Sequence, residues 1–158
     1  MDRANDDEVL QTERLLLRRW RPGDLAIVAP HYADPEVMVF IPGGAWTLEM
    51  TEKVIARMTE RELLNGFGYY PLVRRDDDRI VGHCGLARLE ETGEIEVGYL
   101  LNRPYWGFGY ATEIADRIVG VAFPENHRSI AVMQRVGMHR VGPAQHFGVT
   151  LEKYAIRR

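Results

Sequence analysis

Residues 94–113 read Glu-Ile-Glu-Val-Gly-Tyr-Leu-Leu-Asn-Arg-Pro-Tyr-Trp-Gly-Phe-Gly-Tyr-Ala-Thr-Glu. The alternation of polar and apolar residues at the start predicts a strand over 94–101, which the segment Asn102-Arg103-Pro104 ends. A glycine-rich turn follows, and it opens a helix that we expect to extend to about Phe123. The apolar face of this helix consists of Ala111, Ile114, Ala115, Ile118 and Ala122.

The turn at Gly107 and Gly109 has the properties of an anion site. The first N–H groups of a helix have no partner within the helix, and the helix dipole adds partial positive charge there. Glycines let a phosphate approach the backbone closely. Two familiar phosphate loops do not fit, because no Gly-Lys-Ser/Thr follows and because Thr112 stands where the dinucleotide fingerprint needs glycine or alanine. The alternative is that the glycines only form a turn.

The segments before this stretch mix strands with helices. We expect a first strand over 14–20 and a helix over 24–33 that Asp24 caps. A second helix should run from Thr47 to Gly66, and strands 67–74 and 79–86 should form a hairpin. The apolar positions of the second helix, Met50, Val54, Met58 and Leu63, have helical spacing.

After the third helix, Asn126 can cap a fourth helix that ends at Gly137, and residues 147–157 predict a last strand. The fold class is therefore α+β, or mixed α/β. A chain of 158 residues with 46% apolar residues fits a single domain over 1–158.

Composition and charge exclude several classes of protein. No apolar run is long enough to span a bilayer, and the acidic start Met1–Glu8 does not fit a secretory signal. The net charge of −3, with both signs interspersed, gives no nucleic-acid footprint. The single cysteine, Cys84, suits a reducing compartment, so we expect a cytoplasmic protein without membrane or nucleic-acid partners.

Four motifs in order carry a resemblance to a known family. Residues 106–113 resemble the acetyl-CoA motif of the GNAT superfamily of N-acetyltransferases, closest to the branch of the ribosomal-protein N-terminal acetyltransferases (RimJ/RimL-like). Residues 12–24 resemble that branch's opening strand, and 96–99 resemble its fourth strand. Residues 124–138, with Asn126 and Ser129, resemble its later helix. The resemblance implies a mostly antiparallel twisted sheet flanked by helices, with splayed central strands.

The resemblance also implies how acetyl-CoA, the co-substrate, is bound. Backbone amides at 108–112 would hold the pyrophosphate, exposed backbone at 99–101 would pair with the pantetheine arm, and Asn126 would contact that arm. Phe108 stands where the family often has a basic residue, which removes one side-chain contact to phosphate. The expected cofactor contacts are Tyr99, Leu100, Leu101, Gly107, Phe108, Gly109, Tyr110, Ala111, Thr112 and Asn126.

Acylation of an amine needs a group that removes a proton from the ammonium. Glu96 occupies the family position often proposed as general base; Glu94 lies on the same strand face and is the weaker candidate. The alternative is that both face solvent or pair with arginines. The family's usual acid is a tyrosine, but the matching residue here is Met133, so Ser129 is our candidate, with helix capping as its alternative role.

Other reactive residues point to structural roles. His83 and Cys84 are adjacent on a strand and so face opposite sides, which makes Cys84 a buried structural residue rather than a nucleophile. The remaining histidines show no spacing for metal ligands, so we expect no metal. Three aromatic residues are candidates to line an acceptor cleft, or else belong to the core or its rim: Trp46, Tyr69 and Tyr70.

The family places a strand between its third and fourth helices, yet only two residues, Pro124 and Glu125, lie between the two helices expected here. Two residues reach about 7 Å, too short for a strand with its turns. Either the strand is deleted, or the printed sequence omits residues at this point. We favour omission, because the motifs on both sides are intact.

These observations predict an acetyl-CoA-dependent N-acetyltransferase that acts by direct attack of a primary amine on the thioester. The alternatives are a non-catalytic acyl-CoA sensor or interaction module on the same fold, and a nucleotide-binding domain of another class. The acceptor would be a small-molecule amine or a protein N-terminus, and a homodimer is compatible with the sequence.

Overall fold

A computed structural model describes residues 7–88, 95–115, 119–122, 130, 134, 138–146 and 149–156. The chain divides into two compact units, Met1–Ala87 with Val97–Ala111 and Arg88–Glu96 with Thr112–Arg158. Among the described residues, no helix combines the length and the apolar character that crossing a membrane requires.

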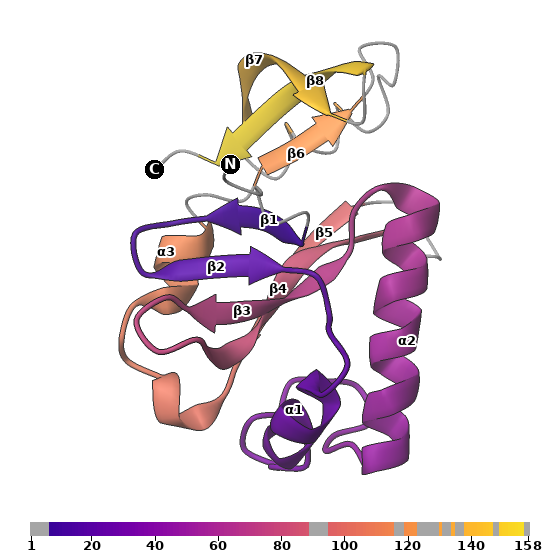
Figure 1. Cartoon of the computed structure of the whole chain (residues 1–158), viewed down its shortest axis with the longest axis vertical. Coiled ribbons are helices and arrows are strands. Elements are labelled where there is room, and N and C mark those ends of the chain that lie inside the picture. Colours follow the sequence, from indigo (N-terminus) through magenta and orange to yellow (C-terminus); the bar gives the residue numbers. More distant parts are fainter. Residues whose placement is uncertain are drawn as a thin grey trace. The chain divides into compact units, whose positions relative to one another are not determined.

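A five-stranded sheet forms the centre of the first unit, with its strands in sequence order (Figure 1). Neighbouring strands from β1 to β4 pair antiparallel, which confirms the hairpin and the strand expected over 14–20. The strand β1, which precedes residue 14, was not expected from the sequence. The five strands are β1 (Glu8–Gln11), β2 (Leu15–Arg18), β3 (Tyr69–Arg74), β4 (Arg79–Arg88) and β5 (Ile95–Leu101).

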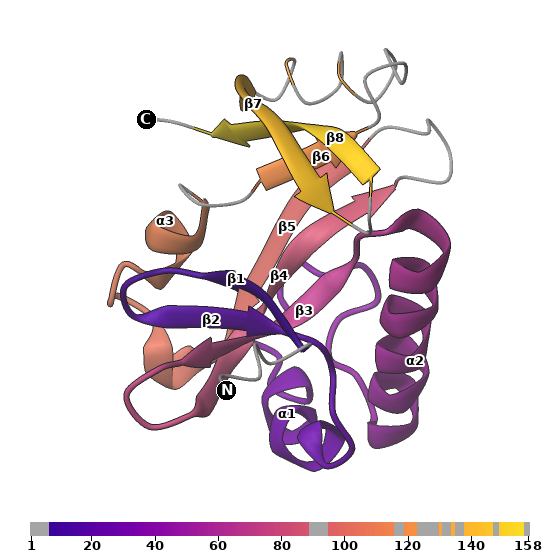
Figure 2. The same ribbon diagram turned by 45° about the horizontal axis from the view of Figure 1, so that its top comes forward.

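Two helices lie beside this sheet, α1 (Asp24–Tyr32) and α2 (Leu48–Asn65) (Figures 1 and 2). The ends of α2 are as expected: the Thr47 hydroxyl accepts from the Met50 N–H at 3.1 Å, and Gly66 ends the helix at φ 75°. The prediction that Asp24 caps α1 is wrong. Gly23 is the N-cap, because the Asp24 carboxylate instead pairs with the buried Arg18 guanidinium at 2.7 Å.

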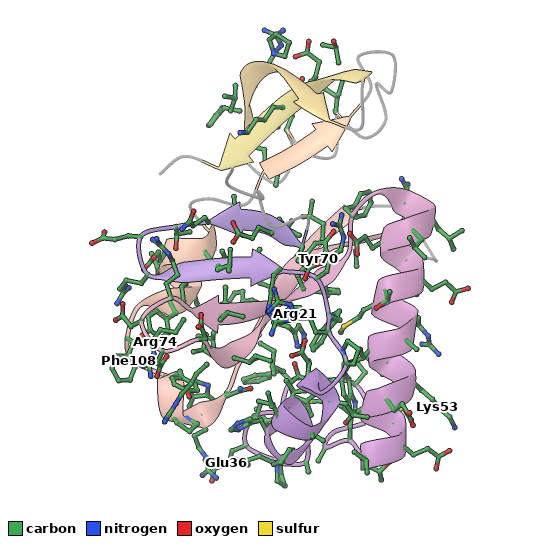
Figure 3. The ribbon with its side chains drawn as sticks, in the orientation of Figure 1. Arg21, Glu36, Lys53, Tyr70, Arg74 and Phe108 are labelled. Carbon is green, nitrogen blue, oxygen red and sulfur yellow. The ribbon has the colours of Figure 1, made fainter. Side chains whose placement is uncertain are left out.

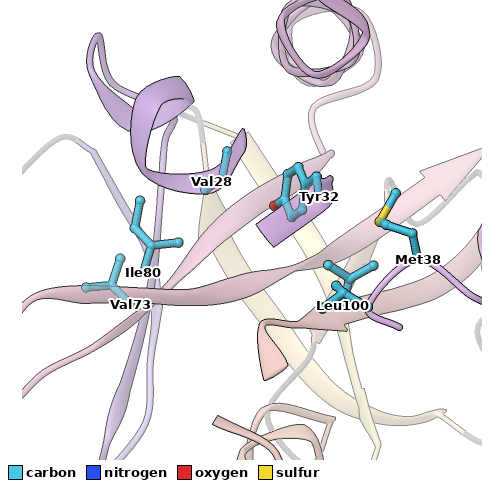
Figure 4. Close-up of a cluster of buried hydrophobic side chains, with 7 residues drawn as sticks. Val28, Tyr32, Met38, Val73, Ile80 and Leu100 are labelled. Carbon is cyan, nitrogen blue, oxygen red and sulfur yellow. The ribbon is translucent and has the colours of Figure 1, made fainter. Parts of the chain in front are cut away.

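The core lies between α1, the segment that follows it, and the sheet (Figure 4). Val28 and Tyr32 of α1 are fully buried against Leu100 of β5 and its neighbours in β3 and β4. A fully buried aliphatic side chain contributes roughly 1.5–3 kcal/mol. This packing holds β5 under α1. The cluster consists of Val28, Tyr32, Val37, Met38, Val73, Ile80 and Leu100.

The helix that this spacing predicts is present, but its apolar positions are not all buried. Met58 is buried, but Met50 is 47% exposed and Leu63 is 83% exposed. Instead, α2 buries Thr51 completely and packs Ile55 against the core. Thr51 can be buried without an unsatisfied hydroxyl because its Oγ1 donates to the Thr47 carbonyl at 2.9 Å.

The second unit contains a three-stranded antiparallel sheet in the order β6-β8-β7. Its strands are β6 (Val119–Ala122), β7 (Met138–His146) and β8 (Val149–Ile156). The last strand was expected, whereas β7 was not. The fourth helix expected over 126–137 lies mostly outside the described residues; the two that are described, Ile130 and Gln134, are helical.

The third helix is shorter than the sequence predicts. A short 3-10 helix, η1 (Arg103–Tyr105), precedes α3 (Tyr110–Ala115), and the segment expected to continue α3 forms β6. The helical pattern beyond Ala115 was therefore misread. Valine favours strands and glycine weakens helices. The segment Val119-Gly120-Val121 can therefore pair antiparallel with β8 instead of continuing the helix.

Candidate active site

The glycine turn before α3 adopts the backbone conformation that a close ligand approach requires. Gly107 and Gly109 have φ values of 82° and 78°, in the left-handed region that favours glycine. A Cβ added at Gly107 would meet no atom within 4 Å, so the backbone there borders open space. Phe108, between them, is 53% exposed. The turn is thus an accessible loop and not a packed connection.

Arg14, which precedes β2, contacts this turn from a distant part of the sequence. Its guanidinium donates to the Phe108 carbonyl at 2.9 Å, and its Cζ lies 4.7 Å from the centre of the Tyr110 ring. A Cβ on Gly109 would lie 3.7 Å from Arg14 Nη2. Sequence reasoning missed Arg14, because 94 positions separate it from Phe108 and no local pattern connects them.

Arg74, at the end of β3, lies on the same side of the first unit as Phe108 (Figure 3). It holds Asp77 with two hydrogen bonds of 2.6 and 3.0 Å, which lower the pKa of Asp77 to about 2. A hydrogen bond to Tyr110 also raises the pKa of Arg74. We call the residues Arg14, Arg74, Phe108, Gly109 and Tyr110 the loop cluster. It brings two cations and open backbone together.

Strand β5 leads into this loop and is the edge strand of its sheet. Tyr99 is 55% exposed, whereas Leu100 is 6% exposed, so Tyr99 is the more accessible of the two to a ligand. The Leu101 carbonyl accepts a hydrogen bond of 2.7 Å from Trp106 Nε1. Asn102, fully buried, donates its N–H to Val81 O and its Nδ2 to Ile80 O, which fixes the end of β5.

Tyr110 and Ala111 begin α3, and Thr112 follows them on the same helix, so the expected pyrophosphate residues 108–112 are contiguous with the turn. Glu96 lies in β5, although its side chain is not among those described. The other catalytic and cofactor candidates, Glu94, Asn126 and Ser129, lie outside the described residues, as does Met133.

Four rings form a second group, which we call the aromatic row: Trp46, Tyr32, His83 and Tyr69. Tyr32 Oη and His83 Nδ1 lie 2.6 Å apart. Each neighbouring pair of rings is edge-to-face, with centres 5.4–5.6 Å apart. Burial lowers the pKa of His83 to about 4 and raises that of Tyr32, so both are neutral at pH 7.

Cys84 and Tyr70 are the sequence neighbours of two residues of the aromatic row, His83 and Tyr69. Cys84 is buried, and burial raises the pKa of its thiol to about 12, which confirms a structural role. Tyr70 is 7% exposed and is held by Glu62, and it points away from the face that carries Tyr69 and His83. Tyr70 therefore does not line the same surface as Tyr69.

The described part of the chain contains no candidate metal site. No three histidine, cysteine, aspartate or glutamate residues there are grouped as metal ligands would be.

Comparisons with known proteins show the family to which the chain belongs. A model of the acetyltransferase (GNAT) domain matches residues 14–139. The uncharacterized N-acetyltransferase YnaD of Bacillus subtilis is 30% identical, over 84% of this chain and 84% of the relative. A crystal structure of a GNAT-family acetyltransferase from Bacillus anthracis is 27% identical, with a TM-score of 0.59 over 94% of this chain and 97% of that one.

A third similar structure is RimL, a ribosomal L7/L12 alpha-N-protein acetyltransferase, in complex with coenzyme A. It is 16% identical, with a TM-score of 0.56 over 94% of this chain and 98% of that one, and so supports the fold alone.

The alignment with YnaD has more positions than the number of residues of this chain that it includes. It runs over 146 positions but covers 84% of 158 residues, about 133, so about 13 positions of the relative face a gap in this chain. The family match nonetheless spans the strands, the glycine turn and the start of β7. The chain belongs to the GNAT family of acetyltransferases, whose reaction is acetyl transfer from acetyl-CoA to an amine.

Proposed function

We propose that this chain acetylates a primary amine by direct attack of the amine nitrogen on the thioester of acetyl-CoA. A C–N bond forms at the carbonyl carbon, the C–S bond breaks, the amine loses a proton and the CoA sulfur gains one. Glu96 takes the proton, directly or through water, and Ser129 is the candidate donor to sulfur. Because the nucleophile is the substrate itself, no covalent enzyme intermediate is required.

The loop cluster is the observation that carries this proposal. An open turn with two left-handed glycines follows an edge strand, and two arginines contact the turn or its neighbours. Backbone N–H groups and guanidinium groups both suit a pyrophosphate. Arg14 thus supplies near the turn the positive charge that Phe108 does not.

The edge of β5 suits the other end of the cofactor. A pantetheine arm carries amides that can pair with strand backbone as an added strand would. We propose that Tyr99, Leu100 and Leu101 provide that backbone, and that Asn126 contacts the same arm. The Leu101 carbonyl accepts one hydrogen bond from Trp106 Nε1, and a carbonyl oxygen has two lone pairs.

For the acceptor, we propose the branch of the protein N-terminal acetyltransferases. RimL acts on a ribosomal protein N-terminus, and the motifs at 12–24, 96–99 and 106–113 resemble its branch. A protein N-terminus is the first class to test, and a small-molecule amine is the second. The mildly acidic chain, with a net charge of −3, suits cationic amines of either class.

Strand β6 lies between α3 and the helical Ile130, but it is formed by residues that the sequence assigns to the third helix, so this part of the chain is still shorter than the family pattern implies. We also propose that the printed sequence omits residues between Phe123 and Pro124, both of which lie outside the described residues. About 13 unmatched positions in the alignment with YnaD are enough for one strand of about 5–6 residues and its turns. The intact mass of the protein expressed from its gene decides this. A mass of 18.1 kDa means a true deletion and favours a non-catalytic binder, and a larger mass means omission.

Calorimetry with acetyl-CoA tests the cofactor site through Gly109→Glu, which places a carboxylate in the turn. We expect this variant to lose measurable binding through steric clash and charge repulsion. Gly66→Glu is the matched control, because Gly66 shares the left-handed conformation but ends α2 and has no Arg14 beside it. Full affinity in the Gly109 variant would locate the phosphates elsewhere.

Release of free CoA thiol tests the reaction itself. The acceptor panel consists of spermidine, benzylamine, L-lysine and tripeptides that begin with serine or alanine. Turnover of any member by the wild type supports the enzyme. Tight binding of acetyl-CoA without turnover of any member favours the sensor.

A further inference from the structure

Among the rings of the aromatic row, Tyr69 is the one that reaches β5. A Cβ added at Gly98 would lie 2.3 Å from Tyr69 Oη and 3.0 Å from Cε1 and Cζ of the same ring. The tip of the phenol therefore rests on the Gly98 backbone, and any larger residue at 98 would displace it. Gly98 lies between Glu96 and Tyr99, so the hydroxyl is at the strand segment assigned to the reaction.

The ring of Tyr69 is held from two sides. Trp20 Nε1 donates to the Tyr69 carbonyl at 2.9 Å, which fixes its backbone. His83 packs edge-to-face against the ring, with 5.6 Å between the ring centres. Tyr69 is also half-buried, which leaves part of it accessible to a molecule from solvent, whereas Tyr32 and His83 are buried.

His83 is in turn fixed by Tyr32. Because burial keeps the Tyr32 phenol protonated and the imidazole neutral, we assign the phenol as the donor to Nδ1 across 2.6 Å. The ring proton of His83 is then on Nε2. Since Tyr32 is fully buried in the core cluster, the row connects the core of the unit to the Tyr69 phenol, which contacts β5.

We propose that Tyr69 is an acceptor-binding residue: its hydroxyl oxygen accepts a hydrogen bond from the amino group that attacks the thioester, and His83, bonded to Tyr32, positions it. This inference rests on the proposed function and names the place where the acceptor docks. A phenol oxygen accepts from an amine or ammonium N–H, and the faces of Tyr69 and Trp46 attract a cation. Both rings are half-buried, so the row offers an ammonium a partly desolvated aromatic wall.

Steady-state kinetics on the acceptor panel test the role of the hydroxyl. Tyr69→Phe removes only that group, and we expect kcat/KM for each accepted amine to fall about tenfold or more, mostly through KM. Calorimetry should give the same acetyl-CoA affinity within about twofold. Tyr70→Phe is the matched control: it removes the neighbouring hydroxyl, which interacts with Glu62, and it should change amine kcat/KM less than about threefold.

His83→Gln tests positioning. We expect it to lower amine kcat/KM by about threefold to tenfold in the wild-type background and by less than about twofold when Tyr69 is already phenylalanine. Near-ultraviolet circular dichroism of each variant measures the folded fraction, so that rates refer to folded protein. Equal losses in both backgrounds would mean that His83 acts through general stability and would overturn its positioning role.

The outcomes separate this inference from the proposed function. An amine that wild type and Tyr69→Phe acetylate equally well would overturn the role of Tyr69 and leave the enzyme intact. Acetyl-CoA binding without turnover of any amine by the wild type would overturn the enzyme, and the acceptor site with it.

Discussion

The loop cluster and the aromatic row lie in the same unit, but different forces hold them. Arg14 contacts the turn, and Arg74 contacts Tyr110 at the start of α3; both side chains are half-buried and charged. In the row, Tyr32 and His83 are buried and neutral, and a single short hydrogen bond joins them. Salt screens the first kind of contact and barely affects the second.

This difference indicates a division of labour between the two ends of the site. An exposed charged cluster can capture a mobile polyanion at little cost to the stability of the fold, because exposed ion pairs contribute only about 0–1 kcal/mol. A buried neutral row sets one geometry and is costly to disturb. Variants of the loop cluster should therefore change cofactor affinity, whereas variants near the row should change the kinetics of the amine reaction or the stability of the fold.

The largest effect is expected at Glu96, on the strand that Tyr69 contacts. Glu96→Gln removes the proposed base and should lower kcat about 10²–10⁴-fold at neutral pH, with acetyl-CoA affinity nearly unchanged. Stopped-flow release of CoA thiol together with calorimetry measures both quantities. A loss below about threefold would mean that another group takes the proton, and a parallel loss of affinity would contradict the division between the two ends.

The next effect concerns stability and pH at His83. Burial lowers its pKa in the folded protein to about 4 from the ordinary 6.5, so between these values the unfolded chain binds more protons. This contribution is complete above about pH 6.5 and is lost as the pH falls toward 4. Between pH 7 and pH 5 it amounts to roughly 2 kcal/mol.

Urea unfolding of the wild type and of His83→Gln over this range measures the difference. The free energy of unfolding should fall more steeply with acid in the wild type than in the variant. Equal slopes would show that His83 does not titrate with folding, and the row would then lose its neutral, buried character.

The smallest effect is expected at Arg14. Arg14→Gln removes the guanidinium from the turn and should weaken acetyl-CoA binding by about tenfold, equal to about 1.4 kcal/mol. Calorimetry at low and high salt should show a shallower salt dependence in the variant than in the wild type. Lys53→Gln on α2, whose partner is Glu49, is the matched loss of one exposed charge and should leave affinity unchanged.

The helices show which parts of the fold could be predicted from sequence. Both ends of α2 carry local signals, Thr47 and Gly66, and both were correct. For α3 the start was correct, but no local signal marked the end at Ala115, and tertiary pairing with β8 overrode the helical pattern. Asp24 carried a cap signal that failed, because a buried arginine competed for its carboxylate.

The site divides in the same way. The glycine turn and β5 could be predicted, since each is contiguous in sequence and has a recognisable pattern. Arg14 and the row of Tyr32 and His83 could not, because they arise where distant segments meet in the folded chain. The roles of Glu96 as base and of Ser129 as acid remain predictions.

The hydrogen bond from Trp106 to the Leu101 carbonyl has a practical consequence. It places an indole that is 46% exposed next to the backbone proposed to receive the pantetheine arm. Indole emission depends on the polarity and hydrogen bonding around the ring, and the other two tryptophans, Trp20 and Trp46, are half-buried. The protein thus carries its own fluorophore at the cofactor end, so that titrations can begin before any acceptor is known.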